Sequence, residues 1–162
     1  VDMISDDEGP FAPERSGGLP CFQLAEMATQ DGVTFPEMMR RMQRKGGLMD
    51  WFGTSDAREI ERRIHEGDGK AALVYEAMAH NLAKNIGKLA VVTRGRLDAI
   101  LLTGGVARSR MLTDWVAERV SFLAPVHVLP GENEMESLAL GVLRVLRGEE
   151  EAHTFAERTE AS

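Results

Sequence analysis

Two adjacent glycines at the end of an apolar stretch constrain the fold of this 162-residue chain more than any other feature. Residues 97–103 are largely apolar, as in a buried β-strand, and Gly104 and Gly105 follow at once. From there to about Val120, apolar residues recur at helical spacing. A strand, a tight turn and a helix in this order indicate a parallel α/β layer, whose ligands gather at the carboxyl ends of the strands.

The glycine pair is also a candidate ligand-binding turn. Glycines carry no side chain, so backbone N–H groups and a helix N-terminus can approach a ligand closely, which suits the phosphates of a nucleotide. The spacing matches neither the dinucleotide-binding fingerprint nor the lysine-containing phosphate loop. The pair by itself therefore fits both a nucleotide site and an ordinary turn.

Composition narrows the classes of protein to consider. Apolar residues make up 43% of the chain, which is enough for one sizeable core, and the net charge of −7 argues against a nucleic-acid-binding protein. No apolar run approaches the roughly twenty residues of a membrane-spanning helix and no signal peptide is visible, so we expect a cytoplasmic protein outside any membrane. The single cysteine, Cys21, is expected to be a buried structural thiol rather than a nucleophile.

The rest of the chain predicts one further strand and several helices. The strand is expected over residues 126–129. Residues 1–148 are expected to form one domain and the acidic stretch 149–162 a disordered tail. The chain begins at Val1 without an initiator methionine, which suggests that an N-terminal portion is missing. Helices are predicted over residues 22–28 and 37–43, from a cap at Ser55 or Asp56 to residue 65, from residues 67–69 to about 93, and over 134–147.

Arg15 is the first candidate functional side chain. It lies in a loop rich in proline and glycine. Its planar guanidinium presents donors that suit carboxylate or phosphate oxygens. From the sequence alone, the alternative of a loop arginine that is solvated or paired with Glu14 is slightly favoured.

Carboxylates after the second predicted strand form another candidate group. Asn133 and Glu136 have the spacing of a helix capping box, which gives Glu136 a structural role. Glu132 and Glu134 are not needed for that box. Either of them is available to hold hydrated magnesium, which prefers carboxylate oxygens.

Several motifs together resemble one family. They occur in the order and spacing of the butyrate kinase branch of the acetokinase family, within the superfamily of sugar kinases, actin and heat-shock ATPases. The resemblance is to the C-terminal part of these enzymes and extends to about Gly148. The motifs are Arg15-Ser-Gly-Gly-Leu-Pro20, Gly46-Gly-Leu48, Gly53-Thr-Ser-Asp-Ala-Arg58, Leu102-Thr-Gly-Gly-Val-Ala107 and Pro130-Gly-Glu-Asn-Glu-Met-Glu136.

This resemblance implies a fold, an activity and site residues. The implied fold is the C-terminal ribonuclease H-like ATPase domain of the family, truncated at its N-terminal side. Family members transfer the γ-phosphoryl group of ATP to a carboxylate with the help of Mg²⁺, which yields an acyl phosphate and ADP. By position, Arg15 corresponds to the catalytic arginine and Glu134 to the acidic residue that positions magnesium. The positions that correspond to the adenosine site are Asp56, Arg58, Gly104, Gly105 and Val106.

Departures from the acetate kinase pattern favour the butyrate branch. Where acetate kinases have Gly-Ile-Gly-Glu-Asn, this chain has Gly105-Val-Ala-Arg-Ser109. Arg108 stands where an uncharged or aromatic residue is expected in the butyrate branch, which leaves its adenine contact open.

The family's N-terminal domain, with its first phosphate loop and acid pocket, has no counterpart in these residues. We therefore expect this chain to supply the nucleotide side of the cleft and to be inactive alone, with a short-chain carboxylic acid and ATP as substrates. The resemblance also implies a homo-oligomer formed through this region. The alternative is a non-catalytic half-domain that binds nucleotide or mediates association.

Overall fold

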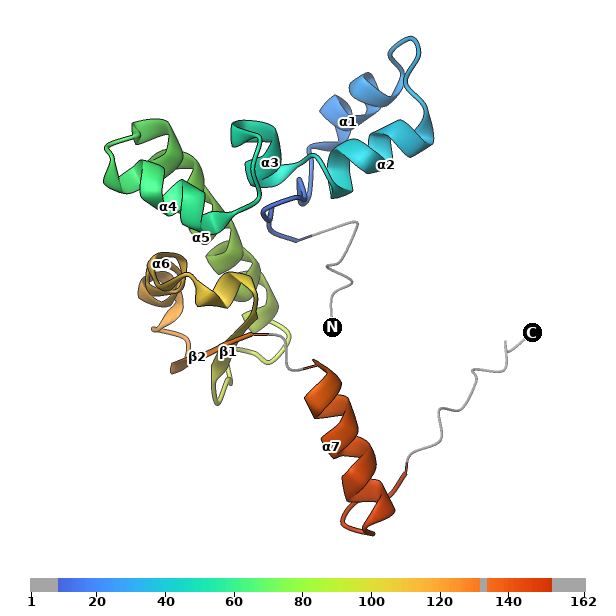
Figure 1. Ribbon diagram of the computed structural model, residues 1–162, viewed down its shortest axis with the longest axis vertical. Helices are drawn as coiled ribbons and strands as arrows, with labels where there is room; N and C mark the ends of the chain where they lie inside the picture. Colours follow the sequence, from blue (N-terminus) through green and yellow to red (C-terminus); the bar gives the residue numbers. More distant parts are fainter. Residues whose placement is uncertain (1–8, 132–133, 153–162) are drawn as a thin grey trace, which may run out of the picture. The chain divides into compact units, whose positions relative to one another are not determined.

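The computed structural model describes residues 9–131 and 134–152, and contacts between residues divide the chain into two units (Figure 1). The first unit spans Val1–Pro130 and the second spans Gly131–Ser162. The helices of the first unit are α1 (Cys21–Ala28), α2 (Phe35–Gln43), α3 (Gly47–Phe52), α4 (Ala57–His65), α5 (Gly69–Ala90), the short 3₁₀ helix η1 (Val106–Arg108) and α6 (Arg110–Val120).

Two parallel strands form the sheet of the described residues. β1 (Ile100–Gly104) pairs with β2 (Val126–Pro130), with Ile100 opposite Val126 and Gly104 opposite Pro130. η1 and α6 connect the two strands, as in a crossover of an α/β fold. This confirms the predicted parallel α/β layer. β1 begins later than predicted because its partner strand, β2, begins only at Val126.

The core lies between the sheet and two helices. Ile100 and Leu102 of β1 are buried in the same apolar cluster as Leu112 and Val116 of α6. α5 contributes further residues to this cluster. The helix packs against both α6 and α4 (Figure 1). Its buried residues recur at helical spacing, and many are small, which allows close packing. They are Ala71, Val74, Tyr75, Met78, Ala79, Ala83 and Ala90.

Side-chain caps fix where several helices begin. Asp56 accepts a hydrogen bond from the backbone N–H of Arg58, which confirms the predicted cap of α4. Ser109 caps α6 by accepting from the backbone N–H of Leu112. The continuous helix predicted directly after the glycine pair is therefore wrong. η1 intervenes, and α6 starts only after Ser109.

Cys21 is a second correction. Its thiol is exposed, whereas the sequence predicted a buried structural cysteine. Cys21 is the first residue of α1, and no residue of this helix is buried against the rest of the fold.

The second unit contains α7 (Glu134–Leu146), close to the predicted range. The helix ends before Gly148, whose N–H donates to the carbonyl of Val145. Its large apolar side chains are exposed on several faces. The predicted cap at Asn133 and the candidate Glu132 lie outside the described residues, as does the tail from residue 153 onward.

Candidate functional site

The backbone around Arg15 is held against the region between α2 and α3. The N–H of Gly46 donates to the carbonyl of Glu14 at 3.1 Å, and the N–H of Met49 donates to that of Pro13 at 2.9 Å. Ser16 donates its N–H to the carbonyl of Met42 at 2.8 Å. We call residues 12–16 the Arg15 loop. The loop is fixed by hydrogen bonds on both sides of Arg15, whose own side chain is exposed.

Gly46 and Gly47 allow the Arg15 loop to lie this close. A Cβ atom on Gly46 would meet the backbone N of Ser16, and would lie 2.8 Å from the carbonyl carbon of Arg15. A Cβ atom on Gly47 would overlap the carbonyl oxygen of Ala12, and the φ of Gly47 is +61°, which disfavours other residues. Both glycines are buried. A side chain at either position would therefore displace the loop that carries Arg15.

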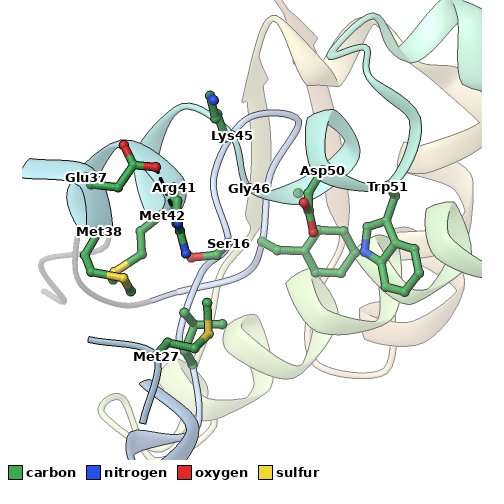
Figure 2. Close-up of a pocket in the computed structure, with 13 residues that line it drawn as sticks. Ser16, Met27, Glu37, Met38, Arg41, Met42, Lys45, Gly46, Asp50 and Trp51 are labelled. Carbon is green, nitrogen blue, oxygen red and sulfur yellow. Dashed lines mark hydrogen bonds and ion pairs between the residues drawn. The ribbon is translucent and has the colours of Figure 1, made fainter. Parts of the chain in front are cut away.

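A pocket of about 670 Å³ lies on one side of the Arg15 loop (Figure 2). Ser16 and Gly46 contribute to its wall, but none of the predicted site residues does. Figure 2 shows three methionines around this space, Met27 from α1 and Met38 and Met42 from α2. We call it the methionine pocket. It was missed in the sequence, because its walls come from segments that are joined only by the fold.

Asp56 and Arg58 form a compact turn at the start of α4. The carboxylate of Asp56 accepts from the backbone N–H of Arg58 at 3.0 Å and pairs with its guanidinium at 2.8 Å. The hydrogen bond from the Arg58 side chain lowers the pKa of Asp56, so that the carboxylate is charged at neutral pH. The Arg58 side chain is 90% exposed. It can therefore still meet a ligand.

Gly104, Gly105 and Val106 lie at the carboxyl end of β1, where the fold places ligands. Gly104 has a φ of +85°, and no atom lies within 4 Å of the position that its Cβ would take. Gly104 is therefore required by its backbone conformation, while the space above it is open. Gly105 and Arg108 are exposed and Val106 is half-buried. The predicted nucleotide turn is thus at the surface, as nucleotide binding requires.

The two predicted nucleotide segments are linked by side chains beyond them. Glu61, one turn into α4 after residues 56–58, accepts a 2.5 Å hydrogen bond from the hydroxyl of Ser109, which follows residues 104–106. The hydroxyl of Tyr75 on α5 lies 2.9 Å from that of Ser109. The structure therefore joins α4, α5 and the N-terminus of α6 through three polar side chains that the sequence analysis did not single out.

The carboxylates are the last of the candidate site groups. The side chain of Glu134, the predicted magnesium ligand, lies outside the described part of the chain. Within the described part, no three His, Cys, Asp or Glu side chains are close enough together to hold a metal ion. The same residues contain no helix long and apolar enough to cross a membrane.

A family model and two relatives match this chain. The model of the Acetokinase family matches residues 8–135. "Probable butyrate kinase 2" of Caldanaerobacter subterraneus subsp. tengcongensis is 48% identical over 142 residues, which are 88% of this chain and 40% of that protein. "Butyrate kinase 2" of Clostridium acetobutylicum is 43% identical over 155 residues, which are 96% of this chain and 44% of that protein. The chain thus spans about two fifths of the length of these relatives.

Solved structures of related enzymes share the fold. Acetate kinase from Porphyromonas gingivalis superposes with a TM-score of 0.71 at 22% identity, over 84% of this chain and 41% of that one. Acetate kinase from Entamoeba histolytica superposes with a TM-score of 0.69 at 21% identity, over 83% of this chain and 42% of that one. A propionate kinase from Francisella tularensis superposes with a TM-score of 0.66 at 20% identity, over 80% of this chain and 39% of that one. The resemblance that the motifs suggested is confirmed, and so is the fold expected from it.

Proposed function

This chain belongs to the acetokinase family, and from that premise we propose that it forms the nucleotide-binding side of an acyl kinase. The reaction transfers the γ-phosphoryl group of ATP to butyrate or a similar short-chain acid. A carboxylate oxygen attacks the γ-phosphorus, the bond to the β–γ bridging oxygen breaks, and ADP leaves. The observation that carries the proposal is the 43–48% identity, over nearly the whole chain, to two proteins named butyrate kinase 2.

The described geometry suits the roles proposed for the individual residues. Arg15 would donate to the oxygens of the transferring phosphoryl group, a role that depends on placement more than on covalent chemistry. Its loop is held at both sides by backbone hydrogen bonds, which limits the positions that the side chain can take. For the adenosine, we propose contacts with Asp56, Arg58, Gly104, Gly105 and Val106.

Magnesium would be held by Glu134. Carboxylate oxygens are the donors that Mg²⁺ prefers, and Glu134 is the first residue of α7, so its backbone position is set by the helix. Bound Mg²⁺ would neutralise charge on the phosphate oxygens. For this chain, the proposal assigns Glu134 the single task of holding that cation.

We expect the chain to be inactive alone, because it covers about two fifths of its relatives. The test is a chimaera in which the N-terminal three fifths of the Clostridium acetobutylicum butyrate kinase 2 precede this chain. Acyl phosphate formed from ATP and butyrate is trapped as the hydroxamate. The chimaera should form acyl phosphate and the isolated chain should not. A folded chimaera that binds ADP without turnover would instead support the non-catalytic half-domain, and turnover by the isolated chain would contradict its expected inactivity.

A further inference from the structure

We infer that Glu61, Tyr75 and Ser109 position the two nucleotide-binding segments, residues 56–58 and 104–106, relative to each other. We call these three residues the Glu61 cluster. They would set nucleotide affinity without touching the nucleotide. The inference rests on the proposed function, because it assigns the binding of adenosine to those two segments.

The cluster is a chain of hydrogen bonds across three helices. The hydroxyl of Ser109 donates to Glu61 Oε1 at 2.5 Å and accepts from the backbone N–H of Leu112 at 3.0 Å. The hydroxyl of Tyr75 lies 2.9 Å from Ser109 Oγ and 3.3 Å from Glu61 Oε1. With the Tyr75 proton donated to Ser109, the Ser109 hydroxyl makes one donated and two accepted bonds, which is its full capacity. This arrangement has little freedom to rearrange.

Burial strengthens these hydrogen bonds. The Tyr75 side chain is fully buried and Ser109 is 7% exposed. Burial raises the pKa of Tyr75 to about 12, with the nearby Glu61 carboxylate also opposing ionisation. Tyr75 is therefore a proton donor at any physiological pH. Removing the Glu61 carboxylate would leave the Tyr75 and Ser109 hydroxyls with one acceptor fewer in a region that water reaches poorly.

The positions of the cluster along the chain explain its proposed role. Glu61 lies three residues after Arg58, so it fixes the first turn of α4, which begins at the Asp56 cap. Ser109 lies three residues after Val106 and is the cap of α6, so it fixes the end of η1. The hydrogen bond between Glu61 and Ser109 spans 48 residues of sequence.

The experiment measures ADP binding by this chain and its variants by calorimetry, together with Tm and hydrogen exchange. Glu61→Ala removes the shared acceptor, while Glu61→Gln keeps an acceptor oxygen and should restore most of the affinity. Tyr75→Phe removes one donor and leaves the ring. The matched control is Glu76→Ala, because Glu76 also joins two helices, through a 2.5 Å ion pair with Arg119, far along the chain from both segments.

For Glu61→Ala, we expect ADP affinity to fall about tenfold. Hydrogen exchange in the unliganded chain should become faster in residues 56–58 and 104–108 together. Glu76→Ala should leave both the ADP affinity and the hydrogen exchange of these residues unchanged. Val120→Ala should lower Tm without weakening ADP binding, since Val120 is a buried core residue of α6.

Wild-type ADP affinity in Glu61→Ala would overturn the positioning role while leaving the proposed function intact. An equal loss of ADP affinity in Val120→Ala would also overturn the positioning role, because lower stability alone would then explain the weaker binding of Glu61→Ala. Failure of the wild-type chain to bind ADP would overturn the nucleotide assignment itself, and this inference with it.

Discussion

Single residues decide where Arg15 lies, and Gly47 is the clearest of them. Gly47→Ala introduces a Cβ that overlaps the carbonyl of Ala12 at a φ of +61°. The substitution should lower the free energy of unfolding by about 2–4 kcal/mol, since strain and overlap both oppose it. Gly53→Ala is the matched control, because Gly53 has a φ of +70° with nothing within 4 Å of its Cβ position. Denaturant titrations of both variants measure the difference, and equal losses would contradict the overlap.

Arg15 itself is tested in the active chimaera. Arg15→Ala should lower kcat about 10³-fold, because a guanidinium that stabilises the transferring phosphoryl group is then absent. Arg15→Lys keeps the positive charge without the planar pair of donors. Its kcat should therefore lie between that of the unsubstituted chimaera and that of Arg15→Ala. Steady-state assays of acyl phosphate formation measure both. A kcat unchanged in Arg15→Ala would remove this residue from the proposed site.

Among the helices, α4 offers a test of charge pairing. Hydrogen bonds from Arg62 and Arg63 lower the pKa of Glu59 from 4.5 to about 2. A carboxyl whose pKa is lower in the folded state stabilises the fold above the unfolded pKa, and this stability is lost as the pH falls toward the folded value. Stability should therefore decline between about pH 4.5 and 2. Thermal unfolding at several pH values should show a weaker decline for Glu59→Gln, and identical profiles would contradict the pairing.

The helices also show which features could be predicted from the sequence. The cap at Asp56 and the approximate range of α5 followed from local pattern, because caps and helical spacing involve residues a few positions apart. The break at η1 and the exposure of Cys21 did not, since each depends on what a helix packs against. The contact of Gly46 and Gly47 with residues 12–16 joins segments thirty positions apart. In the sequence, only the glycine pair itself marks this contact, and a glycine pair does not indicate which segment packs against it.

At the scale of the whole molecule, the apolar surface that α7 leaves uncovered within its own unit favours association. Met135, Leu138 and Leu146 are each more than 60% exposed. Burying such side chains between copies would remove apolar surface from water. We therefore expect the chain to self-associate, and Leu138→Lys to shift it toward the monomer in analytical ultracentrifugation. Ser137→Lys, at an exposed position of the same helix, adds the same single positive charge without removing apolar surface and serves as the control. A wild-type chain that stays monomeric at high micromolar concentration would contradict this.

The most direct test of the nucleotide assignment is hydrogen exchange of this chain with and without ADP and Mg²⁺. The structure offers two distinct places for a ligand, the turn at the end of β1 and the methionine pocket beside the Arg15 loop. We predict that ADP slows exchange in residues 56–58 and 104–108. Protection confined to α1 and α2 around the methionine pocket, or no protection in any segment, would contradict the proposed function.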